Sequence, residues 1–363
     1  MQRFYSIIII FEYLLTIILV KNMNHEIDLS KYQVRTDLAI ELIDENKEID
    51  GISFKKTIFD DITVTDVTVS EEGSININKK AGIYITVEFN DVTDKNNQNL
   101  VLEIFIKKFK EMLEKLELDI KKSCLVIGLG NDRSTPDSLG PLSINNILVT
   151  SHLMELGELA DGFRRVSAIN PGVMGTTGIE TSDIIASIVE KIKPDFIVVI
   201  DALASQSIER VNKTIQMTDT GIHPGSGVGN SRKEISKEIL GIPVIAIGVP
   251  TTVDAVTIVS DTINYMYKHF SYTKENINNP SNKLMVSTPN YLKKKIKIDK
   301  GDKSKLLGLI GNLEDFEIKQ LVFEVLSPVG YNLMVTPKEI DFLIEKLSYI
   351  IGEGINKSLH ENV

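Results

Sequence analysis

Residues 195–201 read DFIVVID, an apolar run that ends in an aspartate, and residues 244–247 form a second such run, VIAI. Strands without polar alternation are typical of a parallel sheet whose two faces are both covered by helices. Strand-like and helix-like segments alternate around these runs, which predicts an α/β fold with a largely parallel sheet flanked by helices. The expected strands are 123–128, 165–169, 195–201, 213–217 and 243–248, and the expected helices are 140–157, 180–192 and 252–269.

The segment before this sheet is predicted to be a small β-rich region. Apolar and polar residues alternate through 52–70 and again through 74–90, where a hairpin is expected to turn near Lys80-Ala81-Gly82. Residues 94–99 are interpreted as a loop, and 100–118 carry apolar residues at helical spacing.

The chain is therefore expected to divide into a β-rich region with its helix, an α/β core, a mobile excursion rich in Asn, Lys and Pro, and C-terminal helices that pack on the core. These parts span 38–118, 119–271, 272–305 and 306–363. In the last part, Thr336-Pro337 is predicted to supply the N-cap and first position of a helix.

The first 22 residues contain the stretch of the chain that most resembles a membrane segment, IIIIFEYLLTIILV at 7–20. Its fourteen residues fall short of the roughly 20 that cross a bilayer, and Glu12 interrupts it. No small-residue cleavage site follows, so residues 1–22 are interpreted as a non-native upstream extension before a true start at Met23. A membrane anchor and a cleaved signal peptide are the alternatives.

The composition excludes several classes of protein. With 42% apolar and 25% charged residues, the chain has the make-up of an ordinary globular protein. Its 40 basic and 50 acidic residues give a net charge of −10, which argues against general binding to nucleic acid or to an anionic membrane. The one cysteine, Cys124, excludes an intrachain disulfide and is expected to be a buried core residue in a reducing compartment.

Three polar segments follow expected strands, at the edge where an open parallel sheet collects ligands and reactive groups. They are the loop 128–141, Asp201 at the end of its strand, and the loop 218–230. Asp137 and Asp201 are the candidate catalytic pair, because two close carboxylates share one proton. The ionised one then activates water while the protonated one polarises a peptide carbonyl. The alternative is that each aspartate caps a helix.

Two further residues of the loop 218–230 are candidates for lining this site. His223 is the only histidine in a predicted site loop, although it has the alternative role of stabilising a turn. Asp219 begins an Asp-Thr-Gly triplet like that of pepsin-like proteases, but those enzymes need two triplets in an all-β framework. Asp219 is therefore interpreted as a loop aspartate that lines the site.

Other chemistries find less support. Gly128-x-Gly130 resembles a dinucleotide fingerprint, but Arg133 stands where the third glycine belongs. A non-enzymatic nucleotide-binding module is retained as an alternative of a different class. The sequence contains no zinc-ligand spacing and no nucleophile elbow, and no cofactor is expected.

Taken together, these segments strongly resemble the germination protease family of spore-forming bacteria. The likeness runs from Met23 to the end of the chain and loosens at 44–100 and 270–305. The matching segments are YQVRTDLAIE (32–41), SCLVIGLGNDRSTPDSLGP (123–141), INPGVMGTTGIETSDII (169–185), KPDFIVVIDALA (193–204), TDTGIHPGSGVGN (218–230), GIPVIAIGVPTTVDAVTI (241–258) and NLMVTPKEID (332–341).

The resemblance implies an endopeptidase that begins degradation of the small acid-soluble, DNA-coating spore proteins at germination, in the cytoplasm of the spore core. The catalytic aspartates of the family correspond to Asp137 and Asp201. The family is regarded as an atypical acid protease, yet its fold is similar to hydrogenase-maturation endopeptidases, which use carboxylates and a histidine around a metal. By that analogy, a metal-dependent endopeptidase with Asp137, Asp201 and His223 as ligands is the minority hypothesis; otherwise no metal is expected.

The resemblance also implies a zymogen that removes its own propeptide, cutting after an acidic residue and before a hydrophobic residue followed by alanine. Asp37, Leu38 and Ala39 match that order, so self-cleavage is predicted between Asp37 and Leu38, with residues 23–37 as the propeptide. Candidates for a basic contact with the acidic residue are Arg133, Arg164 and Arg165. A homotetramer without a direct nucleic-acid or membrane partner is implied as well.

Overall fold

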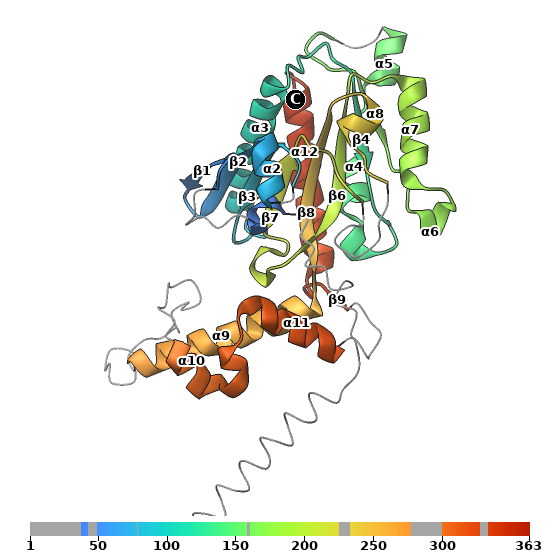
Figure 1. The fold of residues 1–363 in the computed structure, drawn as a ribbon. Helices are drawn as coiled ribbons and strands as arrows, with labels where there is room; N and C mark the ends of the chain where they lie inside the picture. The colour runs from blue at the N-terminus through green and yellow to red at the C-terminus, as the bar shows by residue number, and fades with distance from the viewer. Residues whose placement is uncertain are drawn as a thin grey trace, which may run out of the picture.

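The computed structural model describes residues 38–42, 49–77, 79–157, 160–224, 233–276, 300–326 and 333–363. Within them, a mixed sheet of nine strands carries helices on both faces, which confirms the α/β fold (Figure 1). The predicted extension 1–22, the propeptide 23–37 and residues 225–230 of the third polar loop lie outside the described residues.

One half of the sheet is parallel, as predicted. Its strands lie in the order β8-β6-β4-β5, and every neighbouring pair is parallel. They are β4 (Cys124–Gly128), β5 (Val166–Ile169), β6 (Phe196–Ser205) and β8 (Val244–Asp254). β6 and β8 extend beyond the expected strands, so Asp201 lies inside its strand rather than at the end.

The other half of the sheet is antiparallel. β7 (Thr214–Thr218) pairs with β8 in the antiparallel sense, so the loop after β7 starts at the opposite edge from the carboxyl ends of the parallel strands. This corrects the prediction that all three polar segments share one edge. The remaining strands are β3 (Gly82–Glu88), β2 (Ile62–Val69) and β1 (Ile52–Phe59), with β9 (Met334–Val335) paired to the end of β8.

Two elements of the β-rich region differ from the prediction. Residues Glu71–Ile77 form helix α2 rather than the first strand of a hairpin. The Ser70 hydroxyl accepts the Gly73 N–H at 3.2 Å, and two glutamates occupy the first turn, both of which favour a helix start. Likewise α3 (Lys95–Lys115) begins inside the predicted loop, because Asp94 caps it through the N–H groups of the second and third residues.

Helices cover the two faces of the sheet separately. α3, α4 (Leu139–Ile144) and α12 (Ile340–Leu359) pack with the sheet in the largest apolar cluster, which contains Cys124 and thus confirms its burial. On the second face lie α7 (Thr181–Ile192) and α8 (Lys237–Leu240). The predicted helix 140–157 is divided into α4 and a separate α5 (Ser151–Leu156). The predicted helix start at Thr336-Pro337 is wrong, because α12 begins at Ile340, three residues after Pro337. The short elements are η2 (Ala39–Leu42), η3 (Thr135–Asp137), α6 (Met174–Thr177) and η4 (Ile208–Arg210).

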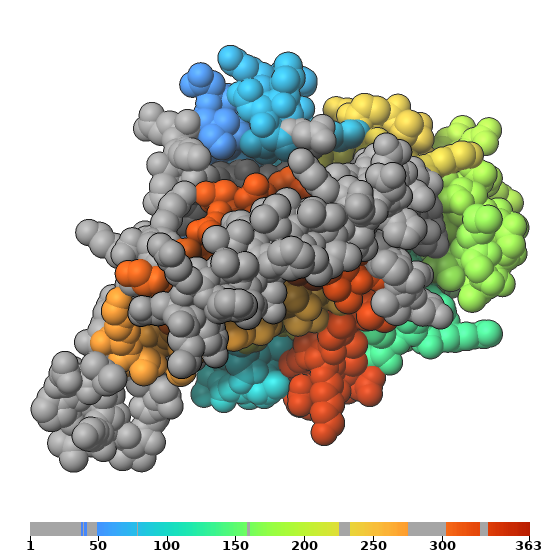
Figure 2. Space-filling model, turned by 60° about the horizontal axis from the view of Figure 1, so that its bottom comes forward, coloured from blue at the N-terminus to red at the C-terminus, as the bar shows by residue number. Residues whose placement is uncertain are grey.

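A group of helices, which we call the arm, lies beyond one end of the sheet (Figure 1). It consists of α9 (Ala255–Asn276), α10 (Lys300–Leu307), η8 (Gly308–Asn312) and α11 (Asp315–Leu326). The arm has its own apolar cluster around Val256, Ile318 and Val322. Figure 2 brings this end of the molecule forward and shows the orange surface of the arm. In the described part of the chain, no helix combines the length and apolarity that a bilayer crossing needs.

Candidate active site

Asp201 lies on the second face of the sheet and is only 6% exposed. Strand alternation places it on the same face as Val199, which packs with α7, and Leu203. Its Oδ1 accepts the N–H of Ala202 at 2.9 Å. In β8 its ladder partner is Gly248, where a Cβ would fall 2.4 Å from the Leu203 side chain. The glycine therefore leaves space for Leu203 beside the aspartate.

A buried polar row extends from Asp201 across the antiparallel half of the sheet. The ladder partners in this row are Asp201, Gly248, Gln216, Thr86 and Thr65. The hydroxyls of Thr65 and Thr86 are buried and make no hydrogen bond to any described residue. Buried polar atoms usually form hydrogen bonds, so a buried row with two unbonded hydroxyls is an unusual feature of a sheet face.

Asp137 reaches the same end of the parallel strands through the turn after β4. The N–H of Leu129 donates to the carbonyl of Ile200 at 2.8 Å, so this turn starts beside Asp201. At Gly130, where φ is +115°, a Cβ would lie 2.0 Å from the Asp137 carbonyl oxygen and 3.2 Å from its Oδ1. Asp137 thus folds back over the glycine, and the chain there must lack a side chain.

Hydrogen bonds hold the turn that carries Asp137. The N–H of Asn131 donates to Asp137 Oδ2 at 2.9 Å and to its carbonyl oxygen at 3.0 Å. The pairing of β6 with β8 skips Thr251, and this bulged residue donates its hydroxyl to the Pro136 carbonyl at 2.6 Å. Bulges are common next to active sites, where they redirect a side chain. Both aspartates therefore lie near the carboxyl end of β4: Asp137 is in the turn that follows β4, and Asp201 is one residue past the β6 partner of Gly128.

The structure does not bear out helix capping as the role of either aspartate. Ser138 stands at the N-cap of α4, and no side chain caps that helix. β6 continues past Asp201 to Ser205, and the next helical turn, η4, is capped by the Ser207 hydroxyl. Both aspartates lie where their carboxylates are not needed to start a helix.

Asp219 and His223 contact other parts of the chain. Asp219 accepts the N–H of Ile83 at 2.7 Å, at the start of β3, and burial raises the pKa of its carboxyl. His223 Nε2 lies 3.4 Å from Glu234 Oε2, and Glu234 in turn pairs with Lys80. Among the described residues, no three His, Cys, Asp or Glu side chains gather as a metal site would require. Asp137, Asp201 and His223 are thus not brought together as ligands.

The segment that begins at Leu38 packs close to Asp201. Leu38 is 0% exposed and forms an apolar cluster with Ile40 and Leu203, against which Ile222 also packs. Leu203 lies two residues beyond Asp201 on the same face of β6. Asp37 itself lies outside the described residues, but Leu38, the residue after the predicted cut, packs on Leu203, two residues from Asp201 along β6.

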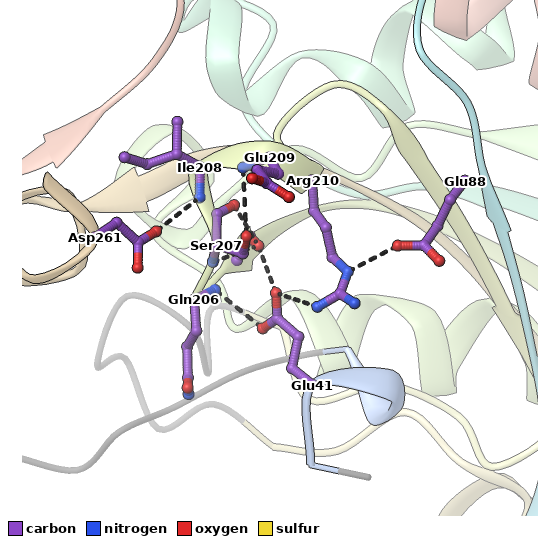
Figure 3. Close-up of polar contacts among 9 residues, drawn as sticks. Glu41, Glu88, Gln206, Ser207, Ile208, Glu209, Arg210 and Asp261 are labelled. Carbon is purple, nitrogen blue, oxygen red and sulfur yellow. Dashed lines mark hydrogen bonds and ion pairs between the residues drawn. The ribbon is translucent and has the colours of Figure 1, made fainter. Parts of the chain in front are cut away.

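Glu41 anchors this segment to the end of β6 (Figure 3). Its Oε1 accepts the Ser205 hydroxyl at 2.6 Å, and its Oε2 accepts the Gln206 N–H at 2.9 Å. Arg210 Nη1 lies 3.5 Å from Glu41 Oε1, and Arg210 Nε donates to Glu88 Oε1 at 3.0 Å. Burial alone would lower the pKa of Arg210, but the two carboxylates raise it, so the guanidinium stays charged.

Two of the three arginines expected to contact the acidic residue before the cut, Arg164 and Arg165, have other partners, while Arg133 stays a candidate. Arg164 is buried and donates to main-chain carbonyls, including those of Asp119 and Lys122 at 2.6 Å each. Arg165 pairs with Glu155. Arg210 was missed, because no local pattern marks it and its role depends on contacts across the fold.

Comparison with known proteins identifies relatives along most of the chain. A family model described as "Germination protease" matches residues 30–363. The germination protease of Geobacillus sp. (strain WCH70) is 51% identical over 362 residues, covering 94% of this chain and 97% of the relative. That of Bacillus cereus (strain AH187) is 50% identical over 357 residues with the same coverage. Among solved structures, a [NiFe] hydrogenase maturation protease, HycI from Thermococcus kodakarensis KOD1, is 20% identical with a TM-score of 0.27, and the match covers 40% of this chain and 80% of that chain.

Proposed function

This chain belongs to the germination protease family, and on that premise we propose that it is an endopeptidase that cuts itself between Asp37 and Leu38 with Asp137 and Asp201 as its catalytic pair. As a member of the family, it is a protease of spore germination. The zymogen behaviour, the cleavage site and the aspartic-type chemistry are the proposal.

The observation that carries the proposal is the position of Leu38. It is fully buried against Leu203, two residues along β6 from Asp201, and this supports a cut near Asp201. Neighbouring residues of an extended strand that share one face are about 6–7 Å apart, which is the reach of a carboxylate and one water. In the proposed reaction, holding the bond close to the carboxylates lowers the entropic part of the barrier.

The proposed reaction uses one proton shared by the two carboxyl groups. The ionised carboxylate takes a proton from a water molecule as the water oxygen attacks the peptide carbonyl carbon. The protonated carboxyl donates a hydrogen bond to the carbonyl oxygen. It then supplies the proton with which the amine leaves when the C–N bond breaks. The buried position of Asp201 excludes most competing water.

We further propose small acid-soluble spore proteins as the substrates and the spore core as the compartment. The net charge of −10 argues against direct contact with DNA. The assembly is proposed to be a homotetramer, with no membrane partner.

Intact mass of the chain expressed from Met23, measured before and after mild acidification, tests the proposal. We expect wild type to lose Met23–Asp37 and Asp201→Asn to keep it. Asp66→Asn is the matched control, because Asp66 is also a strand aspartate but pairs with Lys108 away from the site. A strong chelator that blocks the loss would favour the metal-dependent alternative instead. Retention of the segment in every sample would refute self-processing.

A further inference from the structure

Resting on the proposed function, we propose that the hydroxyls of Thr251 and Thr336 form a brace that positions Asp137 for catalysis. Thr251 bonds to the turn that carries Asp137, and Thr336 bonds to Thr251. Neither threonine is proposed to touch the substrate, so both are positioning residues rather than catalytic ones.

Thr251 ties the turn of Asp137 to the sheet through a proline. Pro136 directly precedes Asp137 in η3, and a proline has no N–H, so its carbonyl is the one main-chain group with which it can hydrogen-bond. The Thr251 hydroxyl donates to that carbonyl at 2.6 Å, and Thr251 is only 1% exposed, so water cannot readily replace it. The hydrogen bonds from the Asn131 N–H to Asp137 close the turn on itself, whereas the bond from Thr251 fixes the turn to β8.

β8 also holds the strand of the second aspartate. Gly248 is the ladder partner of Asp201, and Thr251 follows three residues later, at the point where the ladder skips a residue. An extra residue of this kind redirects the side chain of the bulged strand, and here it aims the Thr251 hydroxyl at the turn. The two aspartates are thus both placed relative to one strand, Asp201 through its ladder and Asp137 through its bulge. The distance between their carboxyl groups therefore depends on the geometry of the bulge.

Thr336 holds the main chain of the bulged residue. Its hydroxyl donates to the Thr251 carbonyl at 2.8 Å. A bulge leaves its extra residue out of the ladder, so Thr336 supplies a partner that pairing with β6 does not give. The segment is aligned by β9, in which Val335 pairs with Val253 just after the bulge. The hydroxyl that was predicted to cap a helix is thus engaged at the bulge instead.

The brace is expected to act on catalysis more than on substrate binding. Misplacing a catalytic group by about 1 Å can lower a rate about 100-fold, while substrate contacts made elsewhere stay intact. Loss of the Thr251 hydroxyl would also leave a carbonyl of the turn without this donor, which favours a shift of the turn toward another partner. The signature of positioning is therefore a lower kcat at an unchanged KM.

Cleavage of a peptide copied from residues 32–45, YQVRTDLAIELIDE, by the processed enzyme tests this inference. We expect Thr251→Val, which keeps the shape of the side chain but lacks the hydroxyl, to lower kcat about 10- to 100-fold with KM within about twofold. Thr251→Ser restores the donor and should recover most of the wild-type kcat. Thr336→Val should lower kcat about 2- to 10-fold, the effect of one hydrogen bond.

Two further measurements separate positioning from a general weakening of the enzyme. The double variant of Thr251→Val and Thr336→Val should have the same kcat as Thr251→Val alone, because Thr336 acts through the Thr251 hydroxyl. The rate at which the chain expressed from Met23 loses Met23–Asp37, followed by intact mass, should fall in each single variant by a factor similar to that for the peptide.

Thr150→Val is the matched control. Thr150 is also 1% exposed, and its hydroxyl donates to the Arg164 carbonyl at 2.5 Å. It also accepts the N–H of Val166 at the amino end of β5, whereas Asp137 follows the carboxyl end of β4. We expect the control to lose stability in urea unfolding and to keep its kcat.

The outcomes distinguish the inference from the function on which it rests. A folded Thr251→Val enzyme with wild-type kcat, or a Thr251→Ser enzyme as slow as Thr251→Val, would overturn the inference alone. An equal loss of kcat in Thr150→Val would overturn it as well. Should Thr251→Val fail to fold, an unchanged kcat in Thr336→Val would overturn the brace. No cutting of the peptide by wild type would overturn the proposed function itself.

Discussion

Gly130→Ala is expected to impair catalysis by displacing Asp137. The added Cβ would lie 2.0 Å from the Asp137 carbonyl oxygen, whereas unstrained carbon contacts are at about 3.5 Å, so the turn must open by roughly 1.5 Å. Misplacing a catalytic group by about 1 Å can lower a rate about 100-fold. The backbone at φ +115° adds a cost of about 1–3 kcal/mol, because alanine rarely adopts it.

The assay is kcat for cleavage of the peptide copied from residues 32–45, measured beside urea unfolding. Gly157→Ala is the matched control, because Gly157 also has a positive φ of +71° but a Cβ there meets nothing within 4 Å. We expect the control to lose stability and keep its kcat. A folded Gly130→Ala enzyme with wild-type kcat would refute the idea that this turn places Asp137 for catalysis.

Three other expectations concern stability and reactivity. Burial raises the pKa of Asp219 above its ordinary value near 3.9. The free energy of unfolding therefore falls as the pH rises from the pKa of the unfolded state to that of the folded state. Asp219→Asn should therefore raise the urea midpoint at neutral pH, and the gain should vanish below about pH 4; no gain at pH 7 would contradict this. Burial also raises the pKa of the Cys124 thiol, so a thiol reagent should label it only in denaturant, and rapid native labelling would be inconsistent with the core. Phe109→Ala should lower the free energy of unfolding in urea by about 3–5 kcal/mol, because the fully buried ring of Phe109 stacks on Phe105. A loss below about 1 kcal/mol would show instead that neighbouring side chains move into the space left by the ring.

The parallel half of the sheet was predictable because strands that are buried on both faces appear in the sequence as uninterrupted apolar runs. The apolar runs at 196–200 and 244–247 have no polar face, and they lie in β6 and β8. The short connection before β7 indicates its direction. Only eleven residues, 202–212, separate the expected strands 195–201 and 213–217, fewer than the dozen or so that a parallel crossover needs.

Other features could not be predicted from local sequence patterns. The alternation in 74–77 imitates a strand, and only Ser70 with the two glutamates after it indicates the helix. Asp137 could be picked out in the loop after its expected strand and Asp201 at the expected end of its own, and the parallel pairing of β4 with β6 brings both near the carboxyl end of β4. The contact between Glu41 and Arg210 joins residues 169 apart, so only the folded chain reveals it.

Thr251 is the point at which three parts of the chain meet. Its hydroxyl donates to Pro136, in the turn that carries Asp137, and its carbonyl accepts the Thr336 hydroxyl at 2.8 Å. Three residues later β8 ends, and α9 of the arm starts at Ala255 without a linker. β8 therefore connects the arm directly, without an intervening loop, to the residue that hydrogen-bonds the turn carrying Asp137.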